Sequence, residues 1–169
     1  MLTTHQAWEK LQADPTFQEW KKANPKSYLY VFFTVLNETT SWEVGFFNPK
    51  EQTAASFLVG ETVEYTHENS KIFKPNDQKV HALELKKIKI GMEEALNVVE
   101  AVCREKYAKE TPAKKIIILQ HLKKPTWNIT YLTTALNVLN VKINASNGMV
   151  LEDSLVSALA FNQAKQKAG

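Results

Sequence analysis

The sequence predicts an α+β fold built from two tandem units, each with a helix laid on a four-stranded antiparallel sheet, followed by a C-terminal helix. Two observations support this fold class. Segments with apolar residues at helical spacing lead twice into runs of β-branched and aromatic residues bounded by turn residues. When the chain is shifted over itself by 85 residues, Trp42 falls on Trp127 and Phe46 falls on Tyr131. The shared order and the matching tryptophans indicate an internal repeat.

The first half begins with two helices, expected near 4–12 and 15–23. Asp14 is a good helix N-cap, and Pro15 suits the first helical position of the second helix. That helix should end before Asn24, which precedes a proline. Runs rich in β-branched and aromatic residues, separated by turn chemistry, then predict four antiparallel strands, at 28–36, 42–47, 55–59 and 62–65.

The second half repeats this order after a polar connector. A helix is expected from Gly91 to about residue 107 or 109, with Glu93 and Glu94 in the first turn, where the helix dipole favours acids. Four further strands are expected, with an Asn147-Gly148 turn closing the last hairpin, at 115–122, 126–133, 138–145 and 149–151.

The C-terminal segment from Glu152 to about Lys165 has the apolar spacing of an amphipathic helix, with acids in its first turn. These elements divide the chain into a first unit at 1–66, a connector at 67–90, a second unit at 91–151, and a C-terminal helix and tail at 152–169.

The second unit resembles the PepSY-type domain. The resemblance is carried by "IGMEEALNVVEAVCREKY", "KIIILQHL", "TWNITYL" and "LNVKINASNGMVL", in which Asn144 stands where the family usually has Asp. It reaches the first unit through the internal repeat. It implies a cystatin-like element with a protein-interaction or peptidase-inhibitor-like role and no catalysis.

Charge is unevenly spread, and the pattern argues against nucleic acid as a partner. Residues 1–85 carry 8 lysines against 11 acids, whereas residues 86–169 carry 13 basic residues against 7 acids. A single arginine among those 13 is unfavourable for reading phosphates or bases, which usually needs the bidentate guanidinium group. The lysine groups therefore indicate a solvated face.

The sequence offers little for catalysis or metal binding, so we expect no enzyme, no cofactor and no metal. No histidine has a second His or Cys at metal-ligand spacing, and the five glycines are isolated, which excludes a glycine-rich phosphate loop. Cys103 falls in a helical pattern and is best explained as a packing residue.

The aromatic residues of the repeat are the remaining candidates for a site. Trp42 and Trp127 open strands at matching positions, so they can cover the helices from within the core. Alternatively, one of them lines a groove with Phe46 or Tyr131 that accepts a peptide or a small apolar ligand. Both interpretations remain open from the sequence.

The first residues lack the basic and apolar regions of a signal peptide, and no window approaches a membrane span, so we expect a cytoplasmic protein without membrane contact. The leading hypothesis is a non-catalytic module that binds a protein or peptide. One alternative is a self-associating protein, a homodimer through sheet edges or the C-terminal helix, with contacts at Leu155, Val156 and Leu159. The other is a small-ligand carrier with a cavity between helix and sheet.

Overall fold

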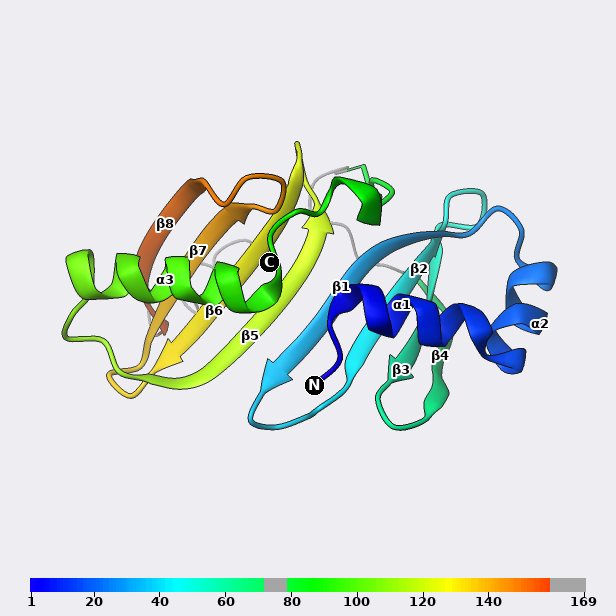
Figure 1. The fold of residues 1–169 in the computed structure, drawn as a ribbon, viewed down its shortest axis with the longest axis horizontal. Helices are drawn as coiled ribbons and strands as arrows, with labels where there is room; N and C mark the ends of the chain where they lie inside the picture. Colours follow the sequence, from blue (N-terminus) through cyan, green and yellow to red (C-terminus); the bar gives the residue numbers. More distant parts are fainter. Residues whose placement is uncertain (72–78, 159–169) are drawn as a thin grey trace.

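The computed structural model describes residues 1–71 and 79–158 and confirms the α+β class with an antiparallel sheet (Figure 1). Its elements in chain order are α1 (Thr4–Ala13), α2 (Pro15–Ala23), β1 (Tyr28–Leu36), β2 (Trp42–Asn48), β3 (Thr53–Val59), β4 (Val63–Lys71), the 3-10 helix η2 (Leu85–Lys87), α3 (Met92–Lys106), β5 (Pro112–His121), β6 (Pro125–Thr133), β7 (Asn137–Asn144) and β8 (Val150–Ser157).

The eight strands found in the described residues form one continuous sheet, in the order β4-β3-β2-β1-β5-β6-β7-β8. The prediction of two units with separate sheets is therefore wrong. Strands β1 and β5 pair antiparallel along their length, with Phe33 opposite Ile118 and Leu36 opposite Lys115. The paired stretches contain apolar runs, Val31–Phe33 on β1 and Ile116–Leu119 on β5. Such runs are better placed in the centre of a sheet than at an edge, where they would expose their backbone and side chains.

The predicted C-terminal helix is also wrong over residues 152–157. Residues 152–157 belong to β8, which pairs with β7 from Asn137 to Ile143. The backbone hydrogen bonds gained beside β7 prevail over an apolar spacing that fits a helix. The rest of the predicted helix, from residue 159 onward, lies outside the described residues.

Helix boundaries follow from capping. Asp14 caps α2, since its carboxylate Oδ1 accepts a hydrogen bond from the Phe17 N–H at 3.0 Å. The start of α3 is closed by Glu94, whose Oε2 accepts a hydrogen bond from the Gly91 N–H at 2.8 Å. The predicted turn before β8 is present too, with Gly148 at a φ of 76°.

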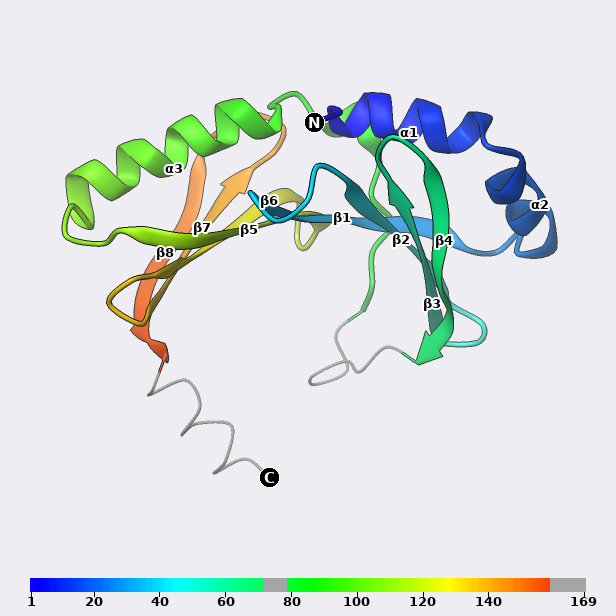
Figure 2. The same cartoon turned by 90° about the horizontal axis from the view of Figure 1, so that it is seen from below.

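Helices α1, α2 and α3 lie on one face of the sheet, and the other face carries no helix within the described residues (Figure 2). The core fills the space between the sheet and these helices, and it runs without interruption through both halves of the chain. Both ends of the sheet curve away from the helices, so the open face is concave (Figure 2).

The connector between the halves is fixed to both of them. The Leu83 N–H donates a hydrogen bond to the Leu29 carbonyl oxygen at 2.9 Å, and the Trp127 indole N–H donates to the Ile90 carbonyl oxygen at 2.8 Å. Leu83 and Ile88 are buried in the shared core. The sheet, the core and the connector therefore join the two halves into one packed body.

Candidate functional site

The four aromatic residues predicted as site candidates all lie on the helix-covered face of the sheet. The exposed fractions are 0% for Trp42, 1% for Phe46, 0% for Trp127 and 3% for Tyr131. The indole N–H of Trp42 donates to the Leu2 carbonyl oxygen at 2.8 Å, so its polar atom is also satisfied inside the protein. This burial favours the core interpretation and leaves no surface groove at the two tryptophans.

The two tryptophans contact each other across the middle of the molecule. Their ring centroids are 6.3 Å apart, with Trp42 on β2 and Trp127 on β6. Phe46 belongs to a separate aromatic group under α1 and α2, in which it lies 5.1 Å from Phe17 and 5.2 Å from Trp20 between ring centroids. The repeated aromatic positions therefore serve packing between and within the halves.

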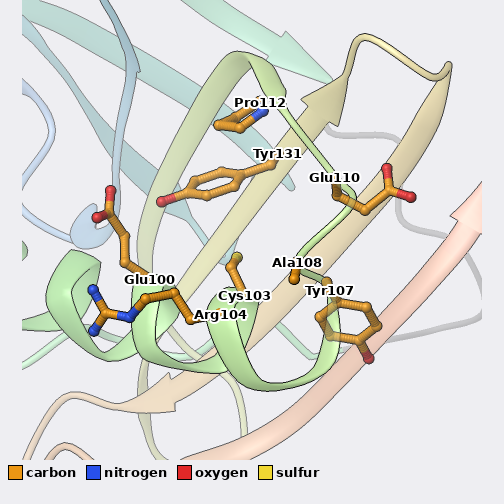
Figure 3. A pocket seen from close by; sticks show the side chains of 8 residues that line it. All are labelled: Glu100, Cys103, Arg104, Tyr107, Ala108, Glu110, Pro112 and Tyr131. Atoms are coloured by element: carbon orange, nitrogen blue, oxygen red, sulfur yellow. The ribbon is translucent and has the colours of Figure 1, made fainter.

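Tyr131 borders a surface cavity. A surface cavity of about 380 Å³ lies at the C-terminal end of α3, beside the start of β5. Figure 3 shows its lining residues, which are Glu100, Cys103, Arg104, Tyr107, Ala108, Glu110, Pro112 and Tyr131. The hydroxyl of Tyr131 points away from Glu110, toward the side on which Glu100 and Arg104 lie (Figure 3).

The Tyr131 hydroxyl is buried and has no hydrogen-bond partner among the described residues. Lys115 Nζ lies 4.9 Å above the centre of the Tyr131 ring and 3.1 Å from Glu100 Oε1. Burial, with the nearby Cys103 and Glu100, raises the pKa of Tyr131. The phenol therefore stays protonated at neutral pH and keeps an unused hydrogen-bond donor beside the cavity.

Two other lining side chains, Cys103 and Glu110, are not arranged for nucleophilic catalysis. Burial, together with the negative charge of Glu100, raises the pKa of the Cys103 thiol, so the nucleophilic thiolate is disfavoured. Glu110 Oε1 accepts a hydrogen bond from Asn137 Nδ2 at 3.0 Å, while its Oε2 is buried without a partner in the described part of the chain. These groups can hold a polar ligand, and none is activated as a nucleophile.

Replacing Tyr131 with phenylalanine tests whether the hydroxyl serves the fold. An unsatisfied buried hydroxyl costs roughly 1–3 kcal/mol, so the Tyr131→Phe protein is expected to be as stable as the original or more stable by about 1 kcal/mol. Urea denaturation of both proteins measures this difference. A loss of stability would show instead that the hydroxyl has a partner inside the folded protein.

The open face of the sheet presents a second candidate surface. Alternate residues of the two central strands point to it, namely Val31, Phe33 and Val35 on β1, and Ile116 and Ile118 on β5. All five are partly exposed, and none belongs to the core cluster or to the apolar residues packed against it. The centre of the concave face is therefore apolar.

Polar residues flank this apolar centre on both sides. On β2, Glu43 lies opposite Phe33, and on β6, Asn128 lies opposite Ile118. Asn140 on β7 donates hydrogen bonds to Asn128 Oδ1 at 2.7 Å and to Thr130 Oγ1 at 2.8 Å, which fixes the side chains on that flank. An apolar centre with an ordered polar rim is the usual anatomy of a protein interface.

The open-face residues are not among the site residues that the sequence predicts. The signal was available, because β1 and β5 are apolar at every position from Val31 to Phe33 and from Ile116 to Leu119. A strand that is apolar on both faces has a second apolar face to cover or to expose. Which face the helices cover cannot be read from that run alone.

Among residues 1–71 and 79–158, no three His, Cys, Asp or Glu side chains come close enough together to hold a metal ion. In the same residues, no helix has both the length and the apolar composition needed to span a bilayer.

Comparison with known proteins gives a similarity of fold. No protein-family model matches the chain, and no curated protein matches its sequence. The structure is similar to the crystal structure of a protein described as a "putative lipoprotein" from Clostridium difficile 630, with a TM-score of 0.52 and 11% sequence identity. The similarity covers 83% of this chain and 90% of that protein. At 11% identity, this similarity shows a shared fold alone.

Proposed function

We propose that this protein is a non-catalytic binding module that holds a protein partner on the open, concave face of its sheet. The observation that carries the proposal is the apolar centre of that face, formed by Val31, Phe33, Val35, Ile116 and Ile118. Sheet faces that remain in contact with water are usually polar, and a contiguous apolar patch with a polar rim is typical of an interaction surface.

The shape of the face supports a protein partner over a small molecule. The sheet extends from β4 to β8 and curves at both ends, so a convex protein surface can contact β2, β1, β5 and β6 together (Figure 2). Aromatic and β-branched side chains in the centre contribute most when a partner excludes water from them. The polar flanks then supply directional hydrogen bonds.

The experiment compares capture of partners by two variants in which apolar β-branched residues are replaced by threonine. In Ile116→Thr/Ile118→Thr, both substituted residues keep a β-branched side chain, so the strand is preserved while the apolar centre is lost. The control, Val98→Thr, lies on α3, on the opposite side of the sheet. Each immobilised protein is exposed to a lysate of the native cells, and the proteins retained are identified and then measured as purified partners.

The proposal expects a partner that binds the original protein and Val98→Thr equally, and binds the double variant at least about tenfold more weakly. A partner that binds the double variant as tightly as the original protein would overturn the open-face assignment. Circular dichroism and thermal melts of the three proteins establish that the comparison is made between folded chains.

A small-ligand carrier is the second candidate, and it is favoured by the cavity beside α3. A ligand that reaches the buried, unpartnered Tyr131 hydroxyl can accept a hydrogen bond from it, and the exposed Arg104 also lines the cavity. A compound that raises the Tm of the original protein and fails to raise that of Tyr131→Phe would support a carrier. If no compound in a broad metabolite set separates the two proteins, the carrier is excluded for that set.

We also propose that each half is related to the PepSY-type unit, with a cytoplasmic setting. The support is the order of elements, since helices precede four antiparallel strands in both halves. The relation is consistent with a binding or inhibitory role, and the partner found by capture tests it. A peptidase among the captured proteins, inhibited on binding, is the outcome that the family relation predicts.

A further inference from the structure

Strand β8 ends the sheet with an open edge that carries apolar residues. It pairs with β7 on one side, and no described strand pairs with its other side. The exposed fractions are 39% for Val150, 39% for Leu151, 36% for Leu155 and 43% for Val156. A regular, apolar edge strand is a template for pairing with another chain.

Strand β4, at the opposite edge of the sheet, is better protected than β8 against pairing with another chain. Strand β4 pairs with β3 through two register shifts, at Ala54/Ser56 and at Ser56/Phe57, and carries the exposed Glu64. Bulges and charges are the usual means by which an edge strand avoids pairing with other chains. The pairing of β8 with β7 is regular from Glu152 to Ser157, and its one register shift lies before that stretch.

The acidic residues of β8 do not protect its edge, because each is paired within its own chain. Glu152 Oε2 lies 2.8 Å from Lys142 Nζ on β7. Asp153 accepts hydrogen bonds from Lys106 Nζ at 2.7 Å and from the Tyr107 hydroxyl at 2.5 Å, which lower the pKa of its carboxyl. Both charges are thus neutralised by α3 and β7, and an approaching strand meets little repulsion.

The hydrogen-bonding pattern between β7 and β8 determines which backbone N–H and C=O groups of β8 are free to pair with another strand. The Ala158 N–H donates to the Leu136 carbonyl oxygen at 2.9 Å, and the β7 pairing keeps a constant register from Ser157 back to Glu152. Because hydrogen-bonded pairs alternate along an antiparallel ladder, the even-numbered residues of β8 direct their backbone groups to β7. The N–H and C=O groups of Asp153, Leu155 and Ser157 therefore point outward.

We propose that β8 pairs antiparallel with β8 of a second copy of this chain, which joins the two sheets into one. A two-fold axis perpendicular to the sheet brings identical strands together antiparallel and keeps the helices of both copies on the same side. With the axis at Leu155, that residue lies opposite the second copy's Leu155, and Asp153 lies opposite the second copy's Ser157. This register matches outward backbone groups with outward backbone groups and places no carboxylate opposite another.

A second copy fits this edge because it supplies a strand of the same length, the same outward groups and an apolar side chain at the axis. The contact uses the edge of the sheet and leaves the open face free for a partner. The self-association and the proposed binding function can therefore be tested independently of each other.

Sedimentation equilibrium of the full chain over a range of concentrations tests the association. The original protein is expected to form a reversible dimer, and Leu155→Lys is expected to weaken it by at least about tenfold, because the two lysines face each other across the axis. Leu122→Lys is the matched control, since Leu122 is also 36% exposed and lies in the turn between β5 and β6. The control should dimerise like the original protein.

Amide hydrogen exchange of the original protein provides a second readout that needs no variant. On raising the protein concentration, the outward amides of Asp153, Leu155 and Ser157 are expected to become protected, while their even-numbered neighbours keep the protection that β7 already gives. A protein that remains monomeric would overturn the proposal. So would a dimer that survives Leu155→Lys, or protection of these amides only after a different captured protein is added.

Discussion

Trp127→Ala is expected to lower the free energy of unfolding by about 3–5 kcal/mol, the range typical of large aromatic residues removed from a core. The side chain is fully buried, and its ring contacts that of Trp42 from the other half of the chain. Its removal also takes away the donor that satisfies the Ile90 carbonyl oxygen. Urea denaturation followed by circular dichroism gives the unfolding free energy of both proteins.

A matched comparison is provided by Trp8→Ala, because Trp8 is only partly buried and packs at the margin of the core. Its loss should cost less than that of Trp127. If Trp127→Ala unfolded with the original free energy and had instead lost the ability to bind a partner, the groove interpretation would replace the core interpretation.

The second large effect distinguishes the two faces of a single strand. Ile117→Asp places a carboxylate in the core, because Ile117 is fully buried on the helix-covered face. A buried, unpaired charge is among the few changes that exceed about 4 kcal/mol, so the protein is expected to be largely unfolded at 25 °C. Its neighbour Ile118 points to the open face, and Ile118→Asp should cost only about 1 kcal/mol, the span of strand propensity.

These two variants have the same substitution, one residue apart, so strand propensity acts on both alike. Thermal melts and circular dichroism of the pair are sufficient to compare them. Equal destabilisation of the two proteins would mean that both faces of β5 are covered, and a larger loss in Ile118→Asp would reverse the assignment of the faces.

Local features of the sequence predicted much of the fold. The helix boundaries follow from Asp14 and Pro15 at one end of α2 and from Gly91 and Glu94 at the start of α3, because capping depends on residues a few positions apart. Strands β1 to β7 were identified from their β-branched and aromatic runs, although β4 was expected to end at Tyr65 and extends to Lys71. These signals depend on neighbours in the chain, so they are visible before the fold is known.

Pairing over long distances could not be predicted in the same way. Nothing within β1 or β5 indicates that they pair with each other, since Phe33 and Ile118 are far apart in the sequence. The sequence did not predict that residues 152–157 form a strand, because the spacing of Leu155 and Val156 fits a helix. The strand forms because β7 lies beside it. Local propensity is routinely overridden by such tertiary contacts.

The candidate site was missed for a related reason. Trp42 and Trp127 were predicted as site residues because they are aromatic and occupy repeated positions. In the structure, both are buried in the core. A choice between the two faces of a fully apolar strand requires knowledge of which face the helices cover. The exposed edge at Leu155 likewise becomes visible only when the order of strands is known.

Side-chain labelling by a photochemically generated carbene, in the free protein and in the complex with its captured partner, tests the open-face claim most directly. In the free protein, Phe33 and Ile118 are expected to be labelled, while Trp42 and Trp127 are not. Binding of the partner should then suppress labelling at Phe33 and Ile118. Unchanged labelling of these two residues in the complex, with protection elsewhere, would contradict the account.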